Sequence, residues 1–241
     1  MSKEQFEDAK NRLILALDVP DVSSGVELLK RVDGQVGLVK IGLELFTRGG
    51  PGVVETVKKM GYDIFLDLKF HDIPNTVAGA VRSARSLGVS MLTVHVGGGK
   101  EMLLRAAAEA GDEMIVLGVT LLTSLGIEDL FPVAIESDPE GVVLRRAKLA
   151  SESALRGVVC SPQEIERVRE TVGTEMVIVT PGIRKENAEI GDQKRAATPK
   201  DAIARGADYL VVGRPISGAA DPGEAARSIV EEMALGLKLR Q

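Results

Sequence analysis

Short apolar runs recur along the chain, and a segment with helical spacing of apolar and polar residues follows almost every one of them. Runs of this length rich in Val, Ile and Leu predict β-strands, and the intervening segments predict helices. The runs are apolar on both faces, which is typical of parallel strands covered by helices. The predicted strands are 12–18, 36–42, 62–68, 89–95, 114–120, 157–160, 176–180 and 209–213.

The segments between the runs carry helix start signals. Asn75 or Thr76 can cap the helix that follows the third run. Ser161 can cap a later helix, with Pro162 at the first helical position and Glu164 at capping-box spacing. These signals support an alternation of strands and helices.

Eight strand–helix units within 241 residues, without a linker-like stretch, predict an α/β fold: a single (β/α)8 TIM barrel domain over residues 1–241. The segment 122–140 is irregular, and we expect a loop with a short helix there. A doubly wound open sheet is the alternative, but the stretch after the first strand has no G-x-G-x-x-G fingerprint. The barrel prediction places catalytic residues at the C-terminal ends of the strands.

An unusual concentration of charge lies at the end of the third strand, in "FLDLKFHDIPNT" (65–76). Residues i and i+2 of a strand point to the same face, so Asp67 and Lys69 should point together into the barrel mouth. Lys40, on the neighbouring strand, can reach them. The sequence therefore predicts an alternating array of Lys40, Asp67, Lys69 and Asp72.

Other polar residues also follow predicted strands. Asp18 closes the first strand, His95 ends the fourth, and Thr123 lies shortly after the fifth. The simpler interpretation is a buried salt-bridge network that holds the barrel together. Because burying several charges usually costs more free energy than their pairing returns, an active site explains the cluster better.

A second signal lies in the loops after strands seven and eight (180–199 and 211–222). Barrel enzymes often bind phosphate with these two loops. Gly213 allows close approach of the backbone, and Arg184 and Arg214 carry guanidinium groups suited to phosphate. These residues predict a phosphate site, although a plain connecting turn is the alternative.

Composition narrows the choice of partners. A formal net charge of −5, no Trp and 3% aromatic residues argue against nucleic-acid binding. The first apolar run is too short to span a membrane and lacks the order of a signal peptide. The single cysteine, Cys160, excludes an intramolecular disulfide and suits a cytoplasmic protein.

Taken together, the motifs resemble the orotidine 5′-phosphate decarboxylase family along nearly the whole chain. The most specific is the D-x-K-x-x-D-I-P-x-T pattern at 67–76. The resemblance implies decarboxylation of orotidine 5′-monophosphate to UMP and carbon dioxide, the last step of de novo UMP biosynthesis, with no metal or organic cofactor. The stretches that carry it are "LALDVP", "VKIG", "DLKFHDIPNT", "TVHVGGG", "VTPGIR", "GDQKRAATP" and "GADYLVVGRPI".

The resemblance also implies roles for the charged array. Lys69 would be the proton donor to C6 of the pyrimidine, and Asp67 would lie near the substrate carboxylate. Lys40 and Asp72 would hold the array in register, and Lys40 would also reach the ribose. Asp72 and Thr76 would be donated across a dimer interface, so we expect a homodimer with shared active sites.

The remaining implied residues bind substrate. Asp18 would accept hydrogen bonds from the ribose hydroxyls, Thr123 would contact the pyrimidine edge, and Pro181 would begin the phosphate loop. The loop 182–195 would close as a lid, and His95 would either pack in the barrel or support the residues that contact the substrate. The phosphate and the ring edge would be held by Arg184, Gln193, Arg214 and the backbone of Gly213.

Two other functions fit parts of the pattern. A related phosphate-binding barrel enzyme, such as a keto-sugar-phosphate decarboxylase or a pentulose-phosphate epimerase, would need a divalent metal and would place a ligand where this chain has Lys40. A catalytically silent nucleotide-phosphate binder would keep the phosphate site but would not need the charged array.

Overall fold

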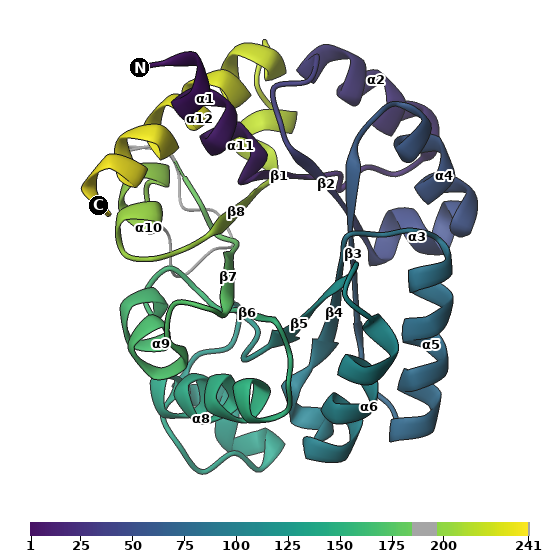
Figure 1. Cartoon of the computed structure of the whole chain (residues 1–241), viewed down its shortest axis with the longest axis vertical. Helices are drawn as coiled ribbons and strands as arrows, with labels where there is room; N and C mark the ends of the chain where they lie inside the picture. The colour runs from purple at the N-terminus through teal and green to yellow at the C-terminus, as the bar shows by residue number, and fades with distance from the viewer. Residues whose placement is uncertain (185–196, 241) are drawn as a thin grey trace.

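The computed structural model describes residues 1–184 and 197–240, and within them eight parallel strands close into a barrel in the order β1 to β8 (Figure 1). Closure by pairing of β1 with β8 confirms the predicted barrel and excludes the open doubly wound sheet. Each strand lies within or close to its predicted run. The bounds are β1 Leu13–Ala16, β2 Leu38–Gly42, β3 Asp63–Phe70, β4 Met91–His95, β5 Ile115–Val119, β6 Gly157–Val159, β7 Val177–Thr180 and β8 Tyr209–Val212.

Helices surround the barrel on its outside (Figure 1), and α1 packs beside the last helix, α12. In the described ranges, no helix combines the length and the apolar character that a membrane crossing requires. The bounds are α1 Lys3–Asn11, α2 Val22–Val32, α3 Leu43–Gly49, α4 Pro51–Lys59, α5 Pro74–Ser86, α6 Lys100–Ala110, α7 Ile127–Leu130, α8 Pro139–Glu152, α9 Ile165–Val172, α10 Pro199–Ala204, α11 Arg214–Ser217 and α12 Pro222–Leu239, with the 3-10 turns η1 Val96–Gly98 and η2 Phe131–Val133.

Two helix starts differ from the sequence prediction. Helix α5 begins at Pro74, with Ile73 in the cap position, so the prediction of Asn75 or Thr76 as cap was wrong. Proline is favoured at the first helical position because it needs no amide partner there. Helix α9 begins at Ile165 with Glu164 in the cap position, so Ser161 is not its cap, although the Glu164 carboxylate accepts a hydrogen bond from the Ser161 amide at 3.0 Å. The irregular segment between β5 and α8 holds α7 and η2, as predicted.

The hydrophobic core has two layers. The larger layer lies between the strands and the helices, where the outward faces of the strands pack against the apolar stripes of the helices. The smaller layer fills the barrel interior, so the barrel has a packed core rather than a pore. This interior layer is formed by Ile14, Ala16, Leu38, Phe65, Met91, Leu117, Val179 and Val211.

Polar residues replace the apolar ones at the next interior level, toward the C-terminal ends of the strands. Side chains two positions apart on a strand share a face, so the residues two positions after the interior layer also point into the barrel. The residues that make the change are Lys40 beyond Leu38, Asp67 beyond Phe65 and Thr93 beyond Met91. The barrel therefore presents buried polar groups at its mouth, on an apolar floor.

Candidate active site

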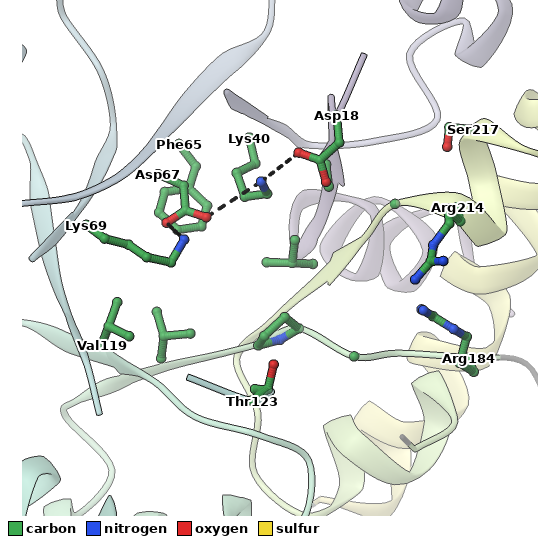
Figure 2. A pocket seen from close by; sticks show the side chains of 16 residues that line it. Asp18, Lys40, Phe65, Asp67, Lys69, Val119, Thr123, Arg184, Arg214 and Ser217 are labelled. Carbon is green, nitrogen blue, oxygen red and sulfur yellow. Dashed lines mark hydrogen bonds and ion pairs between the residues drawn. The ribbon is translucent and has the colours of Figure 1, made fainter. Parts of the chain in front are cut away.

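A cavity of about 500 Å³ opens at the C-terminal ends of the strands, where barrel enzymes carry out their chemistry. This volume is in the range of small-molecule sites. Charged and apolar side chains share its wall (Figure 2). The lining residues are Ala16, Asp18, Lys40, Phe65, Asp67, Lys69, Val119, Thr123, Val159, Pro181, Gly182, Arg184, Val211, Gly213, Arg214 and Ser217.

One wall of the cavity carries a chain of alternating charges (Figure 2). The Lys40 Nζ lies 3.1 Å from the Asp18 Oδ1 and 3.6 Å from the Asp67 Oδ2. The Lys69 Nζ lies 2.8 Å from the Asp67 Oδ1. The structure therefore joins Asp18, Lys40, Asp67 and Lys69 in one network, with the Asp67 carboxylate between two ammonium groups.

Asp67 is the most constrained carboxylate of this network. Its residue surface is only 8% exposed, and Lys40 is 9% exposed. Burial alone would raise the pKa of Asp67. The positive charges of Lys40 and Lys69 and the hydrogen bonds to Asp67 outweigh that effect and hold its pKa below the usual value. Asp67 is therefore a buried anion at neutral pH.

Lys69 lies in an irregular part of β3. Leu66 pairs with Leu92 of β4, but the next pair is Phe70 with Val94, so three residues of β3 face a single residue of β4. Lys69 itself has a φ of 51°, in the left-handed region that non-glycine residues rarely adopt. Asp67 and Lys69 do point together, as predicted, but this bulge and not a regular strand sets their arrangement.

Asp72 and Thr76 lie outside this cavity wall. Asp72 is exposed, and its Oδ1 accepts a hydrogen bond from the Ile73 amide at 2.6 Å. Thr76 lies in the first turn of α5 and is also exposed. The structure thus brings three of the four predicted array residues together within one chain, and Asp72 is the exception.

The opposite wall is positively charged. Arg184 follows β7 and Arg214 begins α11, and their guanidinium groups converge on this side of the cavity (Figure 2). Partial burial and the charge of Arg214 lower the pKa of Arg184. Two cations that converge in this way favour an anion between them. Thr123, Pro181 and Gly213 also line the cavity as predicted, whereas Gln193 and most of the predicted lid lie outside the described residues.

The apolar floor and one hydroxyl were not predicted as site residues. Ser217 lies on α11, where nothing in its sequence context distinguishes it from an ordinary helix residue. The floor could have been found from strand periodicity, because alternate residues of a barrel strand point into the barrel. The floor residues are Ala16, Phe65, Val119, Val159 and Val211.

The two histidines lie beside this site. The rings of His71 and His95 are 5.4 Å apart, and His95 ends β4. Burial lowers the pKa of His95, and the nearby His71 and Lys69 lower it further. Across the described ranges, no group of three or more His, Cys, Asp and Glu side chains is arranged to hold a metal ion.

Known proteins share this sequence and fold. The sequence profile described as the orotidine 5′-phosphate decarboxylase / HUMPS family matches residues 11–229. The orotidine 5′-phosphate decarboxylase of Moorella thermoacetica is 50% identical over 234 residues, 93% of either chain. That of Trichlorobacter lovleyi is 48% identical over 241 residues, covering 96% of this chain and 99% of its own.

A solved structure with a similar fold also belongs to an orotidine 5′-phosphate decarboxylase. The crystal structure of orotidine 5′-phosphate decarboxylase from Lactobacillus acidophilus superimposes with a TM-score of 0.83 at 37% identity, covering 92% of this chain and 98% of that one. The family profile spans most of the chain, and the sequence relatives far exceed the identity needed to establish common membership. The chain therefore belongs to the orotidine 5′-phosphate decarboxylase / HUMPS family.

Proposed function

We propose that Lys69, Asp67 and Lys40 of one subunit, with Asp72 of a second copy, form the catalytic array of an orotidine 5′-phosphate decarboxylase. As a member of this family, the chain decarboxylates orotidine 5′-monophosphate to UMP and carbon dioxide in pyrimidine biosynthesis. The observation that carries the assignment is the buried Asp67 carboxylate held between two ammonium groups at the cavity wall. The array needs no metal or organic cofactor in this proposal.

The reaction leaves an electron pair on C6 of the pyrimidine when the bond to the carboxylate breaks and carbon dioxide departs. The Lys69 ammonium stabilises this developing negative charge and then donates a proton to C6. The resulting amine regains its proton from solvent. Asp67 repels the substrate carboxylate before the bond breaks, and this repulsion disappears as neutral carbon dioxide forms.

The opposite wall binds the rest of the nucleotide. Arg184 and Arg214 hold the phosphate, because their converging guanidinium groups form charge-assisted hydrogen bonds with a dianion. The Gly213 amide assists them, and Gln193, which lies outside the described residues, would join them at the phosphate. Asp18 and Lys40 bind the ribose hydroxyls. Thr123 contacts the edge of the pyrimidine, and Pro181 begins the phosphate loop.

The active enzyme is a homodimer in which each site is completed by the other subunit. Asp72 and Thr76 lie away from the cavity of their own chain, and they are exposed. Two large apolar side chains are also exposed: Ile73, next to Asp72 in sequence, is 67% exposed, and Leu43, the first residue of α3, is 57% exposed. A second copy that covers these side chains would bring its Asp72 and Thr76 to the neighbouring cavity.

A hybrid dimer tests the shared site. Lys69→Ala and Asp72→Ala subunits with different affinity tags are co-expressed, and the doubly tagged hybrid is purified. One site of the hybrid lacks both residues, while the other has Lys69 from one subunit and Asp72 from the other. We expect the hybrid to recover about half of the wild-type turnover per dimer, although both parents are inactive.

The matched control is a hybrid of Lys69→Ala with Asp67→Asn. Both residues act in their own subunit, so each site of this hybrid has one defect and no activity should return. A Lys69→Ala/Asp72→Ala hybrid as inactive as its parents would place Asp72 in the site of its own chain. A monomeric wild-type protein in sedimentation velocity at assay concentrations would remove the shared site altogether.

We also propose that residues 1–241 form a single domain and that the protein is located in the cytoplasm. The barrel uses the chain from β1 to the last helix, which supports one folding unit. The single cysteine, Cys160, is a buried free thiol, which suits a reducing compartment. The partners are therefore the nucleotide substrate and a second copy, without a nucleic acid or a membrane.

A further inference from the structure

The side chain of Thr93, in the middle of β4, links two parts of the catalytic array. Thr93 is fully buried, and its position is two residues beyond Met91 on the inner face of the barrel. Its Oγ1 accepts a hydrogen bond from the Lys69 amide at 2.9 Å. The same hydroxyl donates to the Asp67 Oδ1, also at 2.9 Å.

The chemistry of the three groups fixes the direction of both hydrogen bonds. A backbone amide can only donate, and an ionised carboxylate can only accept. A hydroxyl has one proton to give and lone pairs to receive, so Thr93 must receive from Lys69 and give to Asp67. Valine has the same shape and can do neither.

The bulge in β3 explains why such a link is needed. Residues 67–69 face only Thr93, so the Lys69 amide cannot follow the regular ladder to β4. Lys69 also has a positive φ, a conformation that persists only when its surroundings hold it in place. The Thr93 hydroxyl therefore supplies the hydrogen-bond acceptor that the strand ladder does not provide for the Lys69 amide. Lys69 is also the residue whose Nζ must contact Asp67.

We propose that Thr93 is a positioning residue for the decarboxylation: its hydroxyl locks the bulged backbone at Lys69 to the Asp67 carboxylate. This inference rests on the proposed function of Lys69 and Asp67. Asp67 Oδ1 is then held by two donors, the Thr93 hydroxyl and the Lys69 ammonium at 2.8 Å. Thr93 itself does not line the cavity, so its hydroxyl acts through these two lining residues.

Thr93→Val is the direct test, because it removes the hydroxyl and keeps the volume. A small displacement of reacting groups can reduce a rate by about 100-fold, so we expect kcat to fall on the order of 10- to 100-fold. KM should stay within about twofold, since the ribose and phosphate contacts are unchanged. Thr93→Ser restores the hydroxyl and should return kcat to within about threefold of wild type.

Thr120→Val is the matched control. Thr120 is also a fully buried threonine that follows a barrel strand, but its hydroxyl donates to the Val159 carbonyl at 2.8 Å and does not contact the array. This variant should keep the wild-type kcat even if its melting temperature falls as far as that of Thr93→Val.

Two outcomes would overturn the inference. Wild-type kcat in Thr93→Val, or equal loss in Thr93→Val and Thr93→Ser, would show that the hydroxyl does not position the array. Lys69→Ala, assayed in parallel, separates this failure from failure of the proposed function. If Lys69→Ala is inactive and Thr93→Val is not, only the role of Thr93 is wrong, whereas an active Lys69→Ala removes the catalytic assignment itself.

Discussion

Lys69→Ala should lose more than about 10⁴-fold in kcat, because it removes the proposed proton donor, which is also the cation proposed to stabilise charge at C6. Asp67 would keep Lys40 as a partner at 3.6 Å, so the barrel should still fold. The groups proposed to hold ribose and phosphate are untouched, so the variant should still bind UMP. Loss of absorbance of orotidine 5′-monophosphate measures turnover, and titration calorimetry with UMP measures binding.

Two further variants separate the causes of this loss. Lys69→Arg keeps the positive charge but cannot release a proton, so we expect it to remain at least about 100-fold below wild type. Lys148→Ala removes a surface lysine of α8 that is 69% exposed, and it should behave as wild type. Turnover by Lys69→Ala within tenfold of wild type would contradict the assignment of Lys69 as proton donor.

Arg214→Ala should raise KM on the order of 10- to 100-fold, since a charge-assisted hydrogen bond to phosphate contributes about 1.5–3 kcal/mol. Arg214 begins α11 at the cavity wall and faces Arg184. A smaller fall in kcat should accompany the change, because binding energy from the phosphate can be used at the distant reacting carbon. Steady-state kinetics with orotidine 5′-monophosphate measure both effects.

The nucleoside orotidine, which lacks the phosphate, provides the control substrate. If Arg214 acts through phosphate, wild type and Arg214→Ala should turn over orotidine at the same low rate. Arg227→Ala on α12 is the control variant, because the Arg227 side chain is 59% exposed and pairs with Glu231 of the same helix. Unchanged kinetics in Arg214→Ala, or an equal loss with both substrates, would remove Arg214 from the phosphate site.

Periodicity predicted the barrel because its signal is strong and repeated. All eight apolar runs became strands, since residues buried between a barrel interior and a helix layer must be apolar on both faces. Because the C-terminal ends of parallel strands meet on one side, Lys40 and Asp67 could be placed together without any coordinates. Helix starts were less predictable: Pro74, not Asn75 or Thr76, begins α5.

The bulge at Lys69 could not be predicted from the sequence. Nothing in "DLKF" indicates a positive φ at a lysine, because the strain is compensated by Thr93 on another strand. Thr93 itself fits a strand pattern and gave no functional signal. Asp72 follows the end of β3 and does not line the cavity of its own chain, and a strand pattern carries no information about residues past the strand end.

Turnover of orotidine 5′-monophosphate by purified protein in excess EDTA is the most direct test of the central claim, that a Lys/Asp array alone carries out the decarboxylation. We expect the same kcat with and without EDTA, and no increase when Mg²⁺ or Zn²⁺ is added back. Loss of turnover in EDTA that a divalent metal restores would contradict the account and favour the metal-dependent barrel enzymes. Absence of turnover under both conditions, with UMP still bound, would contradict it in favour of a silent nucleotide binder.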